Sequence, residues 1–227
     1  MDEHTTLRRR EALIALGAGV GALTGIRRLC ELTTATPEAL AASSCVFQRE
    51  VTEGPYDLDL DLVRRNITGD RKGTPLTLRF VALDASTCKP IPGAKVEVWH
   101  ADASGTYSGV AGASGTYLRG VQVADSAGRV RFESIFPSWY RGRSPHIHMK
   151  VFVGGDEVHT GQVFVRQAVQ RTVYRQGVYA SRGLADTTNA SDNIYGSAGD
   201  RAIMSLNRKS SRISSGYTGR LTIGVQA

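Results

Sequence analysis

The sequence predicts an all-β fold, in which an antiparallel β-sandwich core carries long loops and little helix. From residue 45 onward, short segments that alternate apolar and polar residues recur along the chain. Turns rich in glycine and proline separate these segments, as at Pro90-Ile91-Pro92-Gly93. Helical periodicity is scarce over the same part of the chain. Many short strands joined by such turns are typical of a sandwich.

The expected strands follow one another between residues 76 and 225. They are Leu76–Leu83, Ala94–His100, Gly128–Phe132, His146–Val153, Gln162–Val165 and Leu221–Val225. A short helix or turn is expected over residues 166–176. The polar stretch 186–200 is expected to be a long loop, and loops of that size in a compact domain often cover a functional site.

Residues 1–44 are expected to be an export signal and a linker, followed by one domain over residues 45–227. Arg8-Arg9-Arg10 precede Ala12–Ile26, an apolar, glycine-rich stretch that fits a secretory signal better than a membrane span. Paired arginines before such a segment are typical of the twin-arginine route, which carries folded proteins. We therefore expect an exported protein with no stable membrane insertion after signal removal; a basic arm or a single anchor helix is the alternative.

The cysteine content and the charge agree with an exported protein that binds small molecules. Cys45 and Cys88 could form a disulfide in an oxidising compartment, or remain buried thiols, while Cys30 lies at the edge of the signal. The formal net charge of +7 is diffuse outside the N-terminus. No basic run is interleaved with aromatic residues, so nucleic acid is not an expected partner. A mildly basic surface would attract anionic small molecules.

The most informative motif is Tyr140 to His148, which holds a tyrosine, an arginine and a His-x-His pair. Strand side chains repeat their direction every two residues, so His146 and His148 would project from one face. Two imidazoles held that way can bind one metal ion, and a tyrosine oxygen suits ferric iron better than zinc or copper. An ordinary strand with one solvated face has the same pattern.

Other segments decide between these two interpretations. Glu53-Gly54-Pro55-Tyr56, then Pro92-Gly93-Ala94 leading to Val98–Ser108, then Tyr140–His148 and Gly161-Gln162 occur in a characteristic order. In this order and spacing the chain resembles the intradiol ring-cleavage dioxygenases, non-haem ferric enzymes that open catechols between the two hydroxyl-bearing carbons. The resemblance covers roughly residues 45–225 and is closest to exported, compact members. The N-terminal helical segment of cytoplasmic catechol 1,2-dioxygenases is missing.

The resemblance implies that Fe(III) is held by Tyr107, Tyr140, His146 and His148. Tyr107 matches the family position because it follows directly from the expected Val96–Asp102 strand. Three further residues could be mistaken for ligands. They are Tyr117, in a similar Gly-Thr-Tyr context, His100, which we interpret as structural, and His159, which we expect to be exposed in a hairpin.

The resemblance also implies the reaction and the pocket residues. A catechol would bind the iron through both oxygens and react with O2 to give a cis,cis-muconic acid, with Tyr140 leaving the iron to act as a base. Arg143, three residues before His146, matches the active-site arginine, whereas Arg141 is expected at the surface. Gln162 matches a pocket glutamine. Tyr56 and Asp57 either line the rim or simply pack on the Gly54-Pro55 turn.

Two competing functions remain open at the level of sequence. A secreted, noncatalytic β-sandwich binding module would need no metal. A zinc hydrolase using His146 and His148 would need a third histidine or an acidic ligand. The sequence does not choose among catechol, hydroxyquinol, protocatechuate and larger catechols, and it allows a monomer or a small homo-oligomer.

Overall fold

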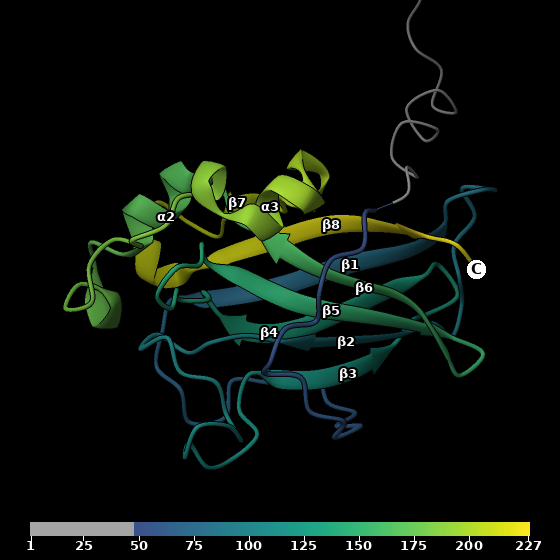
Figure 1. Cartoon of the computed structure of the whole chain (residues 1–227), viewed down its shortest axis with the longest axis horizontal. Helices are drawn as coiled ribbons and strands as arrows, with labels where there is room; N and C mark the ends of the chain where they lie inside the picture. The colour runs from purple at the N-terminus through teal and green to yellow at the C-terminus, as the bar shows by residue number, and fades with distance from the viewer. Residues whose placement is uncertain (1–47) are drawn as a thin grey trace, which may run out of the picture. The chain divides into compact units, whose positions relative to one another are not determined.

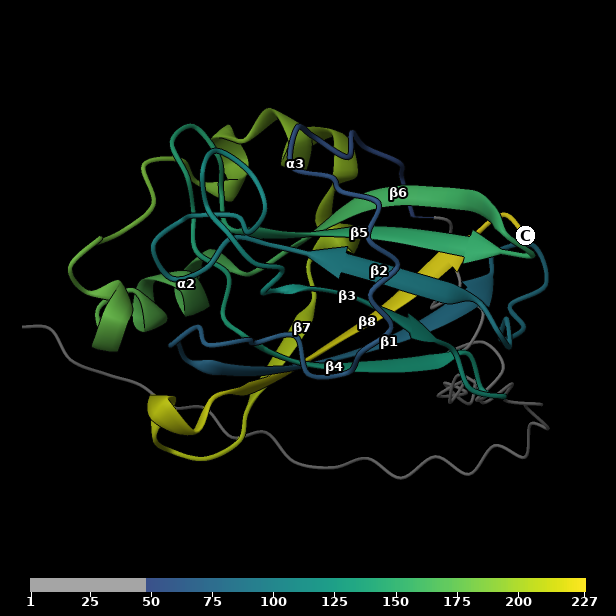
Figure 2. The same cartoon turned by 90° about the horizontal axis from the view of Figure 1, so that it is seen from below.

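The computed structural model describes residues 48–227, and these fold into two four-stranded sheets packed face to face. The expected export signal and linker, together with Cys30 and Cys45, lie outside the described residues. The predicted β-sandwich is confirmed. Figures 1 and 2 show the strands running along the domain, with the helical segments gathered toward one end of them.

The first sheet has the strand order β4-β1-β8-β7. Its strands are β1 (Pro75–Asp84), β4 (Arg129–Ile135), β7 (Ser205–Arg208) and β8 (Tyr217–Val225). β1 pairs with β4 in antiparallel and with β8 in parallel register. The antiparallel sandwich therefore includes a parallel pair, β1 with β8. The last strand returns through a β7–β8 hairpin and inserts beside the first, so the two run in the same direction.

The second sheet has the order β3-β2-β5-β6, and all its pairs are antiparallel. Its strands are β2 (Lys95–Trp99), β3 (Arg119–Val123), β5 (His146–Val153) and β6 (Asp156–Phe164). Directly opposed residues form rows across such a sheet. One row runs through Arg119, Trp99, His148 and Gln162, so these side chains share the outer face.

The hydrophobic core lies between the sheets, as strand alternation requires. Leu76, Leu78 and Phe80 of β1 are buried against the second sheet, whose inward residues include Ile147 and Met149. Ile147 and Met149 alternate with His146 and His148 along β5. The inward residues thus fix the register, and the register in turn aims both histidines outward.

Helices are short and follow the second sheet in sequence. They are α2 (Gln167–Val173), α3 (Asn193–Ala198) and the 3₁₀ turns η1 (Gly177–Tyr179), η2 (Asn189–Ser191), η3 (Asp200–Ala202) and η4 (Ile213–Ser215). α2 lies within the expected 166–176 segment. The structureless loop expected over 186–200 is wrong, because Thr188 and Asp192 cap η2 and α3 with their side chains. Polar residues that look like loop composition are here helix-capping residues.

Three further details differ from the sequence-based expectation. β3 and β7 were not predicted, since β3 contains a glycine and β7 is short and polar. β6 begins at Asp156 rather than near Gln162, and it carries His159 into the interior with no exposed surface. Cys88 is disulfide-bonded. None of the described helices is long and apolar enough to span a bilayer.

Candidate metal centre and substrate pocket

The outer face of β5 forms the floor of the site. His146 and His148 project from it and are 2% and 0% exposed, because loops from distant parts of the chain cover this face. An ordinary solvated strand face would leave such side chains in water. Two imidazoles withdrawn from solvent on one strand face need another reason to be there.

Three atoms that could bind a metal converge above this floor. Tyr107 Oη lies 3.0 Å from His148 Nε2 and 3.3 Å from His146 Nε2, and the two Nε2 atoms are 3.0 Å apart. Tyr107 is itself 4% exposed. It is held by the tight turn after β2, where the Asp102 carboxylate accepts hydrogen bonds from the backbone N–H groups of Ser104 and Thr106.

The protonation states of the histidines suit metal binding. His146 Nδ1 lies 2.6 Å from the Ser144 carbonyl, which can only accept, so Nδ1 carries the proton and Nε2 presents its lone pair. Burial lowers the pKa of His146 to about 3, and burial together with the neighbouring His146 lowers the pKa of His148 well below its ordinary value. Both imidazoles are therefore neutral at physiological pH, as metal ligands must be.

Packing orients the His148 ring on the side away from Tyr107. Its Nδ1 is buried without a hydrogen-bond partner. Trp99 stacks on it with ring centroids 4.9 Å apart and planes 6° from parallel. On another side, a Cβ added to Gly54 would lie 3.3 Å from His148 Cε1. Gly54 also has φ of +74°, so the backbone conformation favours glycine there and a side chain would crowd the His148 ring.

Tyr140 and Tyr56 border the three converging atoms. The Tyr140 ring lies 5.6 Å from His146 and 5.8 Å from Tyr107, between centroids. Tyr56 stacks on Tyr107 at 4.3 Å and meets Tyr140 edge-on at 5.4 Å. Tyr56 thus lines the site, whereas its neighbour Asp57 binds Lys150 at 2.8 Å. Burial raises the pKa of both Tyr107 and Tyr140, so without a cation both stay phenols.

Arg143 connects the site to a distant segment. Its Nη1 lies 3.2 Å from Tyr140 Oη, its Nη2 donates to Gln162 Oε1 at 2.5 Å, and its Nε donates to Asp192 Oδ2 at 2.9 Å. The side chain is 14% exposed. Gln162 is 1% exposed and donates to the Thr52 carbonyl through Nε2, which fixes its oxygen toward Arg143.

The donor set fits a ferric ion. It combines neutral imidazoles with tyrosine oxygens, which are hard and become anionic when a cation lowers their pKa. Within residues 48–227, no three His, Cys, Asp or Glu side chains come close enough together to hold a metal. The third histidine or acidic ligand that a zinc hydrolase requires is therefore not beside His146 and His148 in the described part of the chain.

Comparison with known proteins settles the family. The family model described as "Dioxygenase" matches residues 49–167, more than half of the chain. An intradiol ring-cleavage dioxygenase from Tetranychus urticae superimposes with a TM-score of 0.74 at 33% identity, covering 80% of this chain and 94% of that one. The chain belongs to the intradiol ring-cleavage dioxygenase family.

Two other matches illustrate the range of the family. A stretch of 53 residues is 47% identical to catechol 1,2-dioxygenase from Pseudomonas sp. (strain EST1001), and it spans 23% of this chain and 18% of that relative. The dioxygenase domain of a dioxygenase carbohydrate-binding protein fusion from Streptomyces sp. SirexAA-E has the same fold. Its TM-score is 0.60 at 24% identity, over 78% of this chain and 96% of that domain.

The residues considered as alternative ligands lie elsewhere in this dioxygenase fold. Tyr117 packs with Leu118 and Ile135, and the Arg71 guanidinium stands 4.4 Å from its ring centre. His100 is buried and bonds to the Ala101 carbonyl and Ser134 Oγ, in agreement with a structural role. Arg141 is exposed, as expected. The expectation that His159 is exposed is wrong, because its position on β6 faces the core beside Gly161 and Val163.

Sequence reasoning missed Trp99 as a support for His148 and missed Asp192 entirely. Trp99 could have been found from the strand register. It lies two residues after Glu97 on β2, so both side chains are on the same face, and β2 pairs directly with β5. Asp192 gave only a local signal, that of an N-cap before Ile194 and Tyr195. Its contact with Arg143 joins residues 49 positions apart and has no sequence pattern.

Proposed function

We propose that this protein is an Fe(III)-dependent intradiol dioxygenase that cleaves catechol-type rings with O2 to cis,cis-muconic acid products. The observation that carries the proposal is the convergence of Tyr107 Oη, His146 Nε2 and His148 Nε2 within 3.3 Å of one another, all on buried side chains. Membership of the intradiol family supports it, as does the resemblance of the 53-residue segment to a catechol 1,2-dioxygenase.

Tyr107, Tyr140, His146 and His148 are the residues that would hold the iron. When bound, ferric iron would supply Lewis acidity that draws both catechol oxygens into the anionic form and activates the ring toward O2. The protein's part is to present two neutral imidazoles and two phenol oxygens in a site largely shielded from water. Shielding strengthens each electrostatic interaction inside the site.

Tyr140 is proposed to accept a proton from the catechol at its Oη atom. It is the more exposed of the two tyrosines, and its oxygen already receives a hydrogen bond from Arg143 Nη1. A guanidinium at that position stabilises negative charge on the phenol oxygen before the proton arrives. Tyr107 is fully packed beneath Tyr56 and is better suited to remain in place.

Arg143 is proposed to stabilise the negative charge that develops on the substrate. Two arms of its guanidinium are fixed by Gln162 and Asp192, so the third, Nη1, is directed toward Tyr140 and the pocket. A preoriented donor in a site with little water contributes more than a mobile one, because it needs no reorganisation as charge develops. Gln162 acts by holding this orientation.

The first experiment is the visible absorption spectrum of the purified, iron-loaded protein, before and after anaerobic addition of catechol. Tyrosinate-to-iron charge transfer should colour the protein, and catechol should shift the band to longer wavelength. Tyr107→Phe should change the band strongly. Tyr117→Phe is the matched control, since it removes the other Gly-Thr-Tyr hydroxyl outside the site and should leave the spectrum unchanged.

Turnover completes the test. Catechol, hydroxyquinol and protocatechuate should be supplied separately, with O2 uptake and muconate-type absorbance recorded together. A protein that stays colourless after reconstitution with iron, and consumes no O2 with any of the three, contradicts the proposal. That result would favour a noncatalytic β-sandwich binding module, for which Tyr107→Phe and His148→Ala would be harmless to ligand binding.

We also propose that residues 1–44 direct export by the twin-arginine route and that residues 45–227 form the catalytic domain. The proposal is supported by Arg8-Arg9-Arg10 before the apolar stretch Ala12–Ile26. The disulfide at Cys88 agrees with it, since disulfides persist in oxidising compartments. Replacing the three arginines by lysine should leave the protein in the cytoplasmic fraction, while equal amounts inside and outside the cell for both forms would contradict export.

A further inference from the structure

A buried carboxylate behind the site contacts two of the residues that matter most to it. The side chain of Asp192 is 0% exposed. Its Oδ2 atom accepts from Arg143 Nε at 2.9 Å and from the Ser144 backbone N–H at 2.8 Å. Its Oδ1 atom accepts from the backbone N–H groups of Ile194 and Tyr195, at 2.9 and 3.1 Å. These bonds hold its pKa below the ordinary value although burial opposes this, so the group is ionised.

The first link reaches the guanidinium of Arg143. A guanidinium has five donors in a rigid planar fork, so fixing two of its nitrogens fixes the third. Asp192 takes Nε and Gln162 takes Nη2, which leaves Nη1 facing Tyr140 Oη at 3.2 Å. Without Asp192, the fork could rotate about its long side chain and lose this direction.

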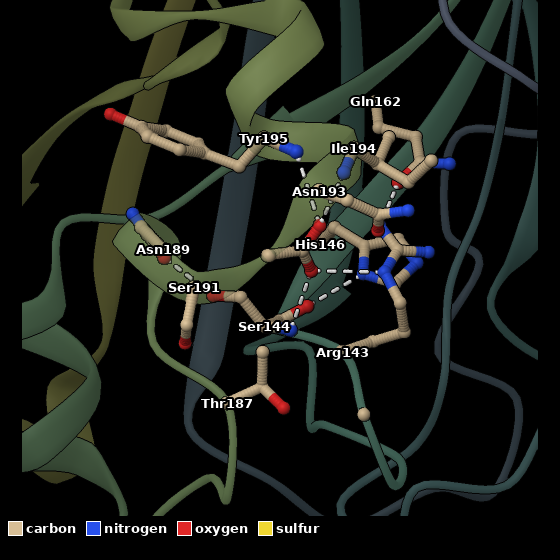
Figure 3. A network of polar contacts seen from close by, with 12 residues as sticks. Arg143, Ser144, His146, Gln162, Thr187, Asn189, Ser191, Asn193, Ile194 and Tyr195 are labelled. Carbon is tan, nitrogen blue, oxygen red and sulfur yellow. Dashed lines mark hydrogen bonds and ion pairs between the residues drawn. The ribbon is translucent and has the colours of Figure 1, made fainter.

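The second link reaches the imidazole of His146 through Ser144. The Ser144 N–H donates to Asp192, and the Ser144 carbonyl accepts from His146 Nδ1 at 2.6 Å. That carbonyl sets the tautomer that turns the His146 Nε2 lone pair toward Tyr107 and His148. Figure 3 shows Arg143, Ser144 and His146 gathered beside the backbone of Ile194 and Tyr195.

The surrounding contacts keep Asp192 in place. Its Oδ1 atom caps the first turn of α3. Asn189, one turn earlier, accepts from Ser144 Oγ and from Gln170 Nε2 of α2, and donates to the Val165 carbonyl. The η2–α3 segment is thereby attached to the start of β5 by side chains that are all buried. When a residue that orients a metal ligand in this way is substituted, metal affinity or activity commonly falls about 10- to 100-fold.

We propose that Asp192 is a positioning residue that orients Arg143 and His146 together, and so couples the direction of the pocket's guanidinium to the alignment of a metal ligand. This inference rests on the proposed dioxygenase function. It assigns a role in the reaction to the 187–195 segment, whose backbone caps and side chains would otherwise be read as ordinary loop structure.

Asp192→Asn is the informative substitution, because it keeps shape and helix capping. Asparagine retains one oxygen for α3, and it is as good an N-cap as aspartate. Its amide nitrogen, however, replaces Oδ2. The amide N–H groups then face the N–H groups of Arg143 and Ser144, so neither of these two hydrogen bonds can form. We expect kcat with catechol to fall about 10- to 100-fold with a much smaller change in KM, and iron affinity to weaken with a shifted tyrosinate band.

Asp186→Asn is the matched control. The Asp186 carboxylate also joins this part of the chain to the Tyr140–His148 motif, by accepting from the Gly142 N–H at 3.2 Å, but it contacts neither Arg143 nor Ser144. Its substitution should leave the absorption band and kcat unchanged. Equal losses in Asp186→Asn and Asp192→Asn would show a general loosening of the segment and would overturn the proposal.

A double-mutant cycle separates the two links. In an Arg143→Gln background, Asp192→Asn should lower kcat little further, because its action on the fork is already lost. It should still weaken iron binding and shift the band, because the path through Ser144 to His146 remains. Additive losses in kcat would contradict action through Arg143, and an unchanged band would contradict action through His146.

Asp192→Ser guards against misfolding, because a serine hydroxyl can cap α3 but cannot reach both partners. It should reproduce the losses of Asp192→Asn. If both variants are unfolded by circular dichroism, Asp192 is a folding element only and the proposal fails. If both are folded with wild-type kcat and spectrum, Asp192 positions neither Arg143 nor His146, and the proposal fails as well. Failure of the proposed function is seen separately, since the wild-type protein itself would then bind no iron and consume no O2.

Discussion

His159 should make this protein sensitive to acid. The ring is fully buried on the core side of β6, and neither ring nitrogen has a hydrogen-bond partner. A Cβ added to Gly161 would lie 2.6 Å from His159 Nε2, so the ring occupies the space above that glycine. Burial lowers its pKa to about 4, against an ordinary value of 6.5. The folded protein therefore holds His159 neutral where the unfolded chain would protonate it.

The magnitude follows from proton linkage. Because the folded-state pKa is depressed, the unfolded state binds more protons between about pH 6.5 and pH 4, and stability falls as the pH drops through that window. Above pH 6.5 the contribution is fully present. A difference of 2.5 pKa units at 1.36 kcal/mol each predicts a loss of about 3 kcal/mol by pH 4. Removing the two unpartnered nitrogens should in addition stabilise the protein by about 1–3 kcal/mol at every pH.

The perturbation is His159→Leu, and the assay is urea unfolding of both proteins from pH 4 to pH 8 with the disulfide intact. The difference in unfolding free energy should be constant above pH 6.5 and widen by about 3 kcal/mol as the pH falls to 4. His100 also has a pKa lowered by burial, to about 4, but it is present in both proteins and cancels in the difference.

The reasoning is refuted if the two stability curves run parallel from pH 8 to pH 4. Parallel curves would mean that His159 binds its proton equally well in the folded protein, through water or a partner that reaches the ring. A variant less stable than wild type at pH 8 would show in turn that the ring's packing contributes more than its two unpartnered nitrogens cost.

Two further predictions concern the outer faces of the sheets. Arg79 lies directly opposite both Arg131 and Arg220 across adjacent strands, so three like charges repel one another. Arg79→Thr should therefore raise the free energy of unfolding by about 0.5 kcal/mol, and the gain should shrink in 1 M salt. An equal effect at all salt concentrations would exclude charge repulsion. Lys150 binds the Glu53 and Asp57 carboxylates at 2.6 and 2.8 Å, and these partly exposed partners imply a loss of about 1–2 kcal/mol in Lys150→Met. Thermal unfolding should show that loss in Lys150→Met and its partial rescue in Lys150→Arg. An unchanged unfolding transition in Lys150→Met would mean that these ion pairs are not needed to hold the segment of Glu53 and Asp57 against β5.

The fold could be predicted largely from strand periodicity. The prediction was wrong where periodicity carries no information. Alternation identified β1, β2, β4, β5 and β8, because an inward apolar row is needed on each. It did not reveal that β8 runs parallel to β1, since strand direction in a sheet depends on how connections cross. It also did not locate α3, because the capping side chains that start this helix have the composition of a loop.

The sequence by itself determined which side chains could share a face. Period-two geometry and the His-x-His spacing place His146 and His148 together, and the same parity puts His159 on the side of Gly161 and Val163, although its polarity had indicated exposure. Only the tertiary structure decided what meets that face. Tyr107 approaches from a turn 39 residues before His146, and Asp192 from a helix start 49 residues after Arg143. Such contacts depend on how separate segments pack around one core, and no local spacing in the chain encodes them.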